Sequence, residues 1–510
     1  KKMTRKRFKG SHNVINLANA SKETSMGQDD ETKVSAFGDD DEEVRMMGEF
    51  YMGSDSEMED DDEEDLPQES SHPSHQPFLP SNLSKEQEEQ IRSGFVYGTD
   101  AHFDYQQRAY TLLHQFKTEW PIPSFDVIAE KSPKHEFPYT IKCVTGAQIC
   151  DAQGERAMKN KNKQRYHAFQ MHLWNLQQLH QTEYDSDEEA EDAPQHLQQR
   201  LPPVFHQERI TLHGKHGDPN RVRVCPHNQH IVASLHETGW LTMHDLSAGF
   251  DKFENRMLPS SMDAGKLMCE IQLPSGGGYG LAFSKLVAGK LAVGDYKGMG
   301  HVFDMKPDGS WYNTNVLKGH TASIEDIQWS PSQPTVVATT GCDSTIKIWD
   351  LRANPAVSQL SWNASSTGDC DVNVFSWSSV QQNRLVSGDD VGSIAVWDMS
   401  YIFEERNKNA SFVAKPSEHF SFHRKAITSI EWHPVSSSLF CASSEDHSVS
   451  IWDIGLEADD HSSNTDVPPQ LFFLHMGMWH VKDTRWHPQL KDVLLSVGEN
   501  RIHVWRPSNM

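Results

Sequence analysis

Residues 318–352, KGHTASIEDIQWSPSQPTVVATTGCDSTIKIWDLR, contain three short apolar runs separated by turn residues. The first run ends at Trp329 and is followed by the strand-breaking Pro331, the second covers 336–338, and the third covers 346–349. Short apolar runs between turn residues are typical of β-strands. One such unit cannot bury both faces of its sheet alone, so we expect it to be repeated along the chain.

The spacing of the aromatic residues shows the repeats. An interval of 20 residues joins Trp329 to Trp349. It recurs from Phe283 to Phe303, Trp377 to Trp397 and Trp432 to Trp452, it is one residue shorter from Trp486 to Trp505, and a degenerate copy holds Val224 and His244. In five of the six copies Asp follows the second position, and this pattern resembles the WD-repeat family. The resemblance implies an all-β fold, a β-propeller.

The resemblance also implies a buried hydrogen-bond set, which matches only two of the repeats. In each of these a His lies 23 residues before a turn Asp. We interpret these residues as structural and not as catalytic dyads, because a buried carboxylate is costly unless it is hydrogen-bonded. The other repeats lack the pair and are expected to depend on packing. The structural set is His320, Asp343 and Trp349 in one repeat, and His423, Asp446 and Trp452 in the other.

Composition limits the classes of function. The chain has 510 residues and a formal net charge of -25, so we expect a basic protein as its partner and no direct contact with nucleic acid. The 7 cysteines are scattered and are interpreted as reduced residues of an intracellular protein. We find no apolar run of the roughly 20 residues that a membrane span needs. Nucleophile–base pairs, metal-ligand arrays and phosphate loops are also missing, so we expect no enzyme activity, cofactor or metal.

The first 98 residues are predicted to be a disordered tail. Residues 1–9 carry six Lys or Arg and resemble a nuclear-import signal. The segment 29–65 has 18 acidic residues and few that could form a core. We interpret it as a polyanion that screens a basic client, with a solubilising tail as the alternative. Three serines that precede acidic residues are candidate phosphorylation sites: Ser54, Ser56 and Ser186.

An amphipathic helix is predicted over 99–120. Ala109, Leu112, Leu113 and Phe116 recur at helical spacing, and the helix would end before Pro121. Four strand-like runs follow at 124–130, 139–147, 165–174 and 204–214. They predict one more blade and therefore a closed ring of seven over 121–507, because closure removes exposed sheet edges. The order of the blades at the seam of the ring is left open.

Four stretches resemble one WD-repeat subgroup: EWPIPSFDVI, QMHLWNLQQLH before the acidic loop 183–192, GDCDVNVFSWSSVQQNRLVSGDD and DVPPQLFFLH. This subgroup contains the retinoblastoma-associated histone-binding propellers and the glutamate-rich WD-repeat proteins that regulate ribosome biosynthesis. The second branch fits better, because its members have a long acidic N-terminal region and an acidic loop after the Asn175-Leu176 pair.

The resemblance implies a monomeric chaperone of the nucleus and nucleolus, which could shuttle with the cytoplasm. Its client would be a newly made large-subunit ribosomal protein, protein three, and pre-ribosomal assembly factors would be further partners. Two alternatives stay open. One is a histone-binding chaperone in chromatin assembly. The other is a cullin-ligase substrate receptor that docks through Trp349-Asp350-Leu351-Arg352.

The same resemblance implies a groove for a basic helix of the client. In the histone-binding relatives a prolyl loop faces the N-terminal helix, and the client lies between them. Here the corresponding parts are the loop 455–470 and the helix over 99–120. Trp479 is a further candidate anchor, since Trp is enriched at binding hot spots. The predicted contacts are Phe103, Tyr110 and Leu113 on the helix and Asp459, Asp460 and Asp466 in the loop.

Overall fold

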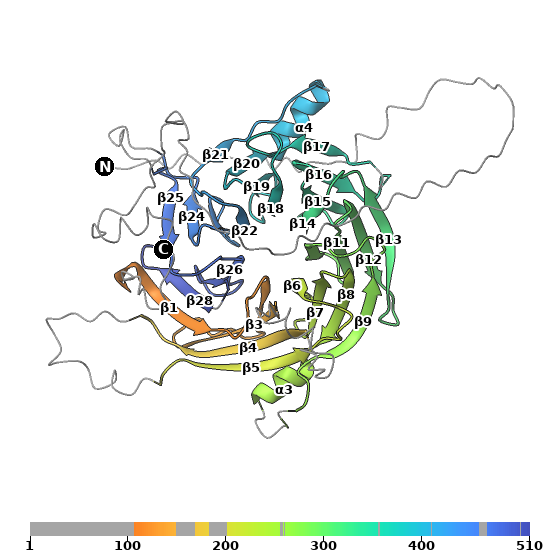
Figure 1. Cartoon of the computed structure of the whole chain (residues 1–510). Helices are drawn as coiled ribbons and strands as arrows, with labels where there is room; N and C mark the ends of the chain where they lie inside the picture. The colour runs from red at the N-terminus through yellow and green to blue at the C-terminus, as the bar shows by residue number, and fades with distance from the viewer. Residues whose placement is uncertain are drawn as a thin grey trace, which may run out of the picture. The chain divides into compact units, whose positions relative to one another are not determined.

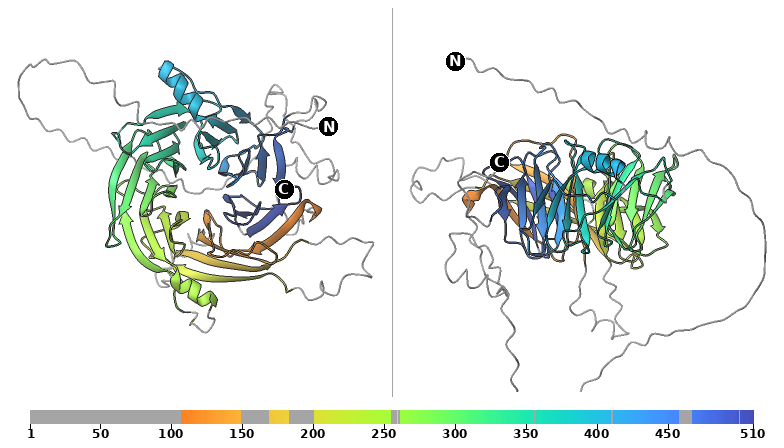
Figure 2. Two further views of the ribbon diagram at one scale, coloured as in Figure 1. Left: turned by 180° about the vertical axis from the view of Figure 1, so that it is seen from behind. Right: turned by 90° about the horizontal axis from the view of Figure 1, so that it is seen from above.

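The computed structural model describes residues 107–148, 169–182, 201–254, 259, 261–354, 357–409, 411–457, 467–499 and 501–510. These residues form seven four-stranded antiparallel sheets around one axis, the blades of a β-propeller (Figures 1 and 2). The predicted all-β, seven-bladed fold is therefore confirmed. The tail predicted over 1–98, the acidic loop 183–192 and the three candidate phosphorylation sites lie outside the described residues.

The strands are numbered in chain order. The first blade contains β2 (Phe125–Ile128), β3 (Tyr139–Ala147), β4 (Gln170–Leu179) and β5 (Val204–Thr211), and the second contains β6 (Pro219–Val224), β7 (Ile231–His236), β8 (Trp240–Asp245) and β9 (Lys266–Gln272). The third contains β10 (Gly280–Phe283), β11 (Lys290–Gly294), β12 (Met299–Met305) and β13 (Trp311–Lys318), and the fourth contains β14 (Ile324–Trp329), β15 (Val336–Gly341), β16 (Thr345–Asp350) and β17 (Leu360–Asn363).

The last three blades follow the same order. The fifth contains β18 (Val372–Trp377), β19 (Arg384–Asp389), β20 (Ile394–Asp398) and β21 (Glu418–Phe420), and the sixth contains β22 (Ile427–Trp432), β23 (Leu439–Ser444), β24 (Val449–Asp453) and β25 (Leu471–His475). The seventh contains β26 (Asp483–Trp486), β27 (Leu494–Val497), β28 (Arg501–Pro507) and β1 (Tyr110–Lys117). The short helices η2 (Gln107–Ala109), α3 (Ser247–Glu254) and α4 (Met399–Lys408) complete the described elements.

The 20-residue interval has a simple cause in the pairing of the strands. Trp329 on β14 pairs with Val337 on β15, which pairs with Trp349 on β16. We call these three positions the cross-strand row of the blade. Two antiparallel hairpins return the chain to the same register after a fixed length, so the interval repeats. The other rows are Val127–Cys143–Trp174, Val224–Val232–His244, Phe283–Leu291–Phe303, Trp377–Leu385–Trp397, Trp432–Phe440–Trp452 and Trp486–Leu494–Trp505.

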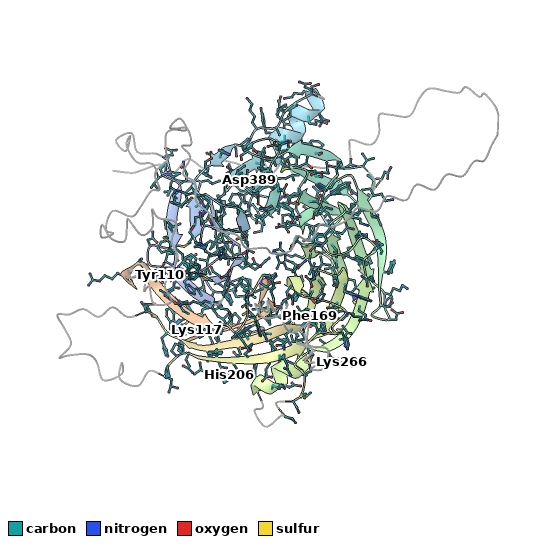
Figure 3. All side chains as sticks on the ribbon, in the orientation of Figure 1. Tyr110, Lys117, Phe169, His206, Lys266 and Asp389 are labelled. Carbon is teal, nitrogen blue, oxygen red and sulfur yellow. The ribbon has the colours of Figure 1, made fainter. Side chains whose placement is uncertain are left out.

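The ring closes through the two ends of the described chain. β1 pairs with β28, so that Tyr110 lies opposite Pro507 and Lys117 opposite Arg501. The seventh blade thus takes three strands from the C-terminal end and its outermost strand from the N-terminal end. Figure 3 labels the two ends of β1 at Tyr110 and Lys117. This arrangement supplies the seam order that the sequence left open.

The helix predicted over 99–120 is wrong for the residues that the structure describes, since 110–117 form β1. The apolar residues at helical spacing divide between the two faces of this strand. Leu112 and Phe116 pack in one buried cluster, and Leu113 packs with Ala109 against another. The unpaired edge of β28 gives the segment hydrogen-bond partners along its whole length, and this tertiary pairing outweighs the local periodicity.

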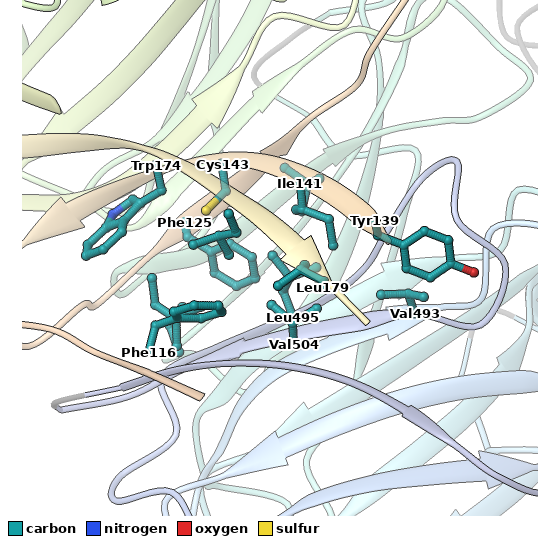
Figure 4. Close-up of a cluster of buried hydrophobic side chains, with 14 of the residues drawn as sticks. Phe116, Phe125, Tyr139, Ile141, Cys143, Trp174, Leu179, Val493, Leu495 and Val504 are labelled. Atoms are coloured by element: carbon teal, nitrogen blue, oxygen red, sulfur yellow. The ribbon is translucent and has the colours of Figure 1, made fainter. Parts of the chain in front are cut away.

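A large buried cluster joins the first blade to the seventh. Phe125, Cys143 and Trp174 come from the first blade, and Phe116 and Val504 come from the seventh (Figure 4). Each fully buried side chain of this size contributes roughly 1.5–3 kcal/mol to folding. The closure therefore depends on apolar packing as well as on the β1–β28 pairing.

Candidate functional site

The fourth blade brings its predicted His, Asp and Trp together. His320 Nδ1 donates to Asp343 Oδ1 at 2.9 Å, and Thr339 Oγ1 lies 2.7 Å from His320 Nε2. Trp349 Nε1 donates to the same Thr339 oxygen at 2.8 Å. Burial would raise the pKa of Asp343, but the hydrogen bonds from His320 and Thr345 hold it well below its usual range. Each of these polar groups has its hydrogen-bond partner inside the same blade, which indicates a structural role.

The sixth blade repeats the arrangement with Ser in place of Thr. His423 Nδ1 donates to Asp446 Oδ2 at 2.8 Å, and Ser450 Oγ lies 2.7 Å from both His423 Nε2 and Trp452 Nε1. Burial would raise the pKa of Asp446, but the hydrogen bond and charge of His423 lower it to about 2. The members of these sets that were not predicted from the sequence are Thr339 and Thr345 in the fourth blade and Ser448 and Ser450 in the sixth.

The third and fifth blades do not depend on packing alone, which corrects that expectation. Each has a buried Asp placed two positions earlier in the turn than the usual Asp. Asp295 accepts hydrogen bonds from His301 Nε2 at 2.9 Å and from the backbone N of Met299 at 2.8 Å. Asp389 accepts from the backbone N of Ser393 at 2.8 Å. In both blades the Asp at this earlier position therefore holds the turn by hydrogen bonds. Its position could have been predicted from the turn sequences GDYKG (294–298) and GDDVG (388–392).

A buried polar chain links the closing strand to the sixth blade. Tyr110 OH lies 2.9 Å from His475 Nδ1, and His475 Nε2 lies 3.0 Å from His503 Nδ1. The His475 ring also stacks on Trp505, with 4.3 Å between ring centroids. Burial lowers the pKa of His475 to about 3 and that of His503 well below its usual value. Both histidines are therefore neutral at physiological pH. Their hydrogen bonds connect β1, β25 and β28 where the ring closes.

The predicted client groove is only partly within the described residues. Phe103 and the loop aspartates Asp459, Asp460 and Asp466 lie outside them. Tyr110 is 4% exposed, so its side chain is not on an open surface, and Leu113 packs against the core of the seventh blade. Trp479 is half-buried in the loop before β26, with its ring 5.5 Å from that of His447.

Arg352, proposed to dock a ligase adaptor, forms a two-pronged ion pair with Asp350. The guanidinium Nε and one terminal nitrogen donate to the carboxylate at 2.9 and 2.6 Å. The Arg352 side chain is nevertheless 53% exposed. Adaptor docking through this residue stays a prediction.

A cavity of about 450 Å³ lies on the propeller axis, lined by the innermost strands of all seven blades, and we did not predict it from the sequence. In each blade, the residue just before the first member of the cross-strand row lines this cavity. We call these seven residues the axial ring. Its members are Asp126, Arg223, Ala282, Gln328, Ser376, Glu431 and Arg485. These residues could have been predicted from the sequence, because each one directly precedes the first residue of a cross-strand row.

The acidic members of the axial ring join neighbouring blades. Asp126 Oδ2 accepts from the backbone N of Val224, and Glu431 Oε2 accepts from that of Trp486, both at 2.8 Å. The inner edge of an innermost strand carries backbone N–H groups that have no neighbouring strand to bond with. These carboxylates accept hydrogen bonds from two such groups. Burial raises the pKa of Glu431, although the charge of Arg485 opposes the shift.

Among the described residues, neither α3 nor α4 is long and apolar enough to cross a membrane. The same residues contain no group of three or more His, Cys, Asp or Glu side chains placed to hold a metal ion.

The fold, the repeated rows and the buried His–Asp sets define a WD-repeat β-propeller. Residues 311–350 and 414–453 match the family described as WD domain, G-beta repeat. The chain is 30% identical to "Glutamate-rich WD repeat-containing protein 1" of Dictyostelium discoideum, over 80% of this chain and 83% of that protein. The chain belongs to the family of glutamate-rich WD-repeat proteins.

Two further relatives bear on its function. The chain is 29% identical to "Ribosome assembly protein rrb1" of Schizosaccharomyces pombe, over 95% of this chain and 93% of that protein. It is 22% identical to "Histone acetyltransferase type B subunit 2" of Candida glabrata, over 58% of this chain and 64% of that protein.

Proposed function

We propose that this chain is a non-catalytic binding protein that acts in ribosome assembly. It holds a newly made basic protein of the large ribosomal subunit, protein three, in the nucleus and nucleolus until that client joins the pre-ribosome. The observation that carries this proposal is the similarity to the ribosome assembly protein of Schizosaccharomyces pombe, which extends over 95% of the chain. The net charge of -25 supports a basic client, because complementary charge attracts the client and disfavours nucleic acid.

The contact surface proposed for the client differs from the groove expected from the sequence. Tyr110 is buried at the seam, so it is withdrawn as a direct contact. The acidic loop 455–470 directly precedes β25 in the chain, and Trp479 follows it. We keep both as proposed contacts of the client. We assign the basic side chains of the client to Asp459, Asp460 and Asp466, and an apolar contact to Trp479.

Binding kinetics with the purified ribosomal protein test this surface. Reversal of the three loop aspartates to Lys is expected to slow association and to weaken its dependence on salt, because exposed charges mainly control encounter. A matched control reverses three exposed carboxylates elsewhere, Asp308, Glu404 and Glu418, and keeps the same change in net charge. Circular dichroism must first show that both variants are folded. The loop is not the client site if its variant associates as fast as the control.

A histone client is the second candidate. It is supported by the similarity to the histone acetyltransferase subunit, which covers 58% of this chain. Affinity purification from cells with and without a block in translation separates the two functions. A client held only while newly made disappears from the complex during the block, whereas a histone pool already present persists. A complex that contains histones but no large-subunit ribosomal protein in untreated cells would contradict the first proposal.

A further inference from the structure

The axial cavity holds an arginine whose charged group has spare donors. The guanidinium of Arg485 forms ion pairs with carboxylate oxygens of Asp126, Glu431 and Asp483 at 3.8–3.9 Å. These distances are too long for hydrogen bonds. Its buried Nε has no acceptor among the residues that the structure describes. The Arg485 side chain is 21% exposed, so its two terminal nitrogens, and not the buried Nε, offer a fork that can bind an anion with two oxygens.

A lysine from the opposite side of the ring adds a second positive charge. Lys285 follows β10, in the third blade, is exposed and lines the cavity. Its charge and that of Arg485 both act on Glu431, which belongs to the sixth blade. Glu431 itself is engaged through Oε2 by the backbone N of Trp486. Both cations therefore act on the part of the cavity around Glu431.

The other acidic groups near the axis are engaged as acceptors. Asp126 accepts from the backbone N of Val224 at 2.8 Å and from that of Val127 at 3.0 Å. Asp326, which also lines the cavity, accepts from the backbone N of Ile327 at 2.9 Å, and Asp483 accepts from Ser429 Oγ at 2.9 Å. By contrast, the hydrogen-bonding groups of Arg485 and Lys285 are all donors. They suit a ligand that is rich in acceptors and negatively charged.

We propose that the axial cavity binds a small phosphate-bearing anion, with Arg485 and Lys285 as the charged contacts. The volume of about 450 Å³ suits a compact organic phosphate, since pockets for small molecules are typically about 300–1,000 Å³. The phosphate oxygens supply several acceptors at once and match the guanidinium fork. Because this site is formed by the propeller alone, it is independent of the client proposed above.

The test uses the full chain and isothermal titration calorimetry at matched ionic strength. The probes are inositol hexakisphosphate and tripolyphosphate as phosphate anions, and citrate as a carboxylate anion. Both phosphate probes are expected to bind at one site per chain, and Lys285→Glu is expected to weaken that binding at least tenfold. Glu431→Gln keeps an oxygen for the backbone N of Trp486 but removes the competing charge, so it should strengthen binding.

Lys297→Glu is the matched control, because it makes the same charge change in the same blade. Lys297 is exposed in the turn between β11 and β12, whereas Lys285 lies in the loop between β10 and β11, at the other end of β11. Its variant should bind like the parent. The proposal is overturned if neither phosphate probe binds, if citrate alone binds, or if Lys297→Glu weakens binding as much as Lys285→Glu.

Discussion

Replacement of Asp446 with Ala is expected to destabilise the propeller by about 2 kcal/mol. In the folded chain the pKa of this carboxyl is about 2, against an ordinary value of 3.8, and this difference corresponds to roughly 2 kcal/mol of favourable interaction. The side chain is 18% exposed, so solvent screening reduces the effect only in part. The substitution also leaves the buried His423 without its acceptor, which costs about 1–3 kcal/mol by the usual rule. These two figures describe the same hydrogen bonds and are not added.

Equilibrium unfolding in urea at pH 7, followed by tryptophan fluorescence, measures this loss. Trp452 is a suitable reporter, because its indole donates to Ser450 and stacks on Phe420 with 4.5 Å between centroids. The matched control is Asp390→Ala, in the equivalent turn of the fifth blade, where the Asp is exposed. Equal unfolding midpoints for the two variants would refute the reasoning.

The dependence on pH gives a second check of the same interaction. The folded pKa of Asp446 is depressed, so its contribution is fully present above about pH 3.8 and is lost as the pH falls through about 2. The difference in stability between the parent and Asp446→Ala should therefore shrink in that window. A difference that stays constant down to pH 2.5 would mean that the charge of Asp446 is not its source.

Two further predictions concern the seam. Tyr110→Phe leaves His475 Nδ1 without its partner and should cost about 1–3 kcal/mol, whereas Tyr401→Phe on the exposed face of α4 should cost little; equal thermal melting of the two variants would contradict this. Because burial lowers the pKa of His475 to about 3, the unfolded chain takes up a proton below pH 6.5 and the folded chain does not. The free energy of unfolding should fall between pH 6.5 and 5 by about 2 kcal/mol for such a group, and urea midpoints that are level across this range would exclude the effect.

The blades were predictable because their signal is local in the chain. Trp329 and Trp349 belong to one cross-strand row, and two hairpins of regular length set the distance between them. The residues that face the axis could be inferred in the same way. The position before the row faces the axis, and so the charges at Glu431 and Arg485 could have been placed in the cavity from the sequence alone.

The role of 110–117 could not be predicted from its own residues. Leu112, Leu113 and Phe116 satisfy a helical spacing as well as an alternating one, and short apolar segments are often ambiguous in this way. The strand is selected by β28, which lies about 400 residues away in the chain and supplies the hydrogen-bonding edge. The polar chain from Tyr110 to His475 has the same origin, since it joins groups separated by 365 residues.

Closure of the ring by β1 and β28 has a consequence during protein synthesis. Tyr110 emerges from the ribosome long before Pro507, its partner in the blade. At about 5–20 residues per second, the intervening chain takes roughly 20–80 seconds to make. Throughout that interval six blades can form while β1 has no neighbour, and an unpaired apolar strand invites aggregation. Each nascent copy of this chain is therefore an open ring that needs protection until its last strand has been translated.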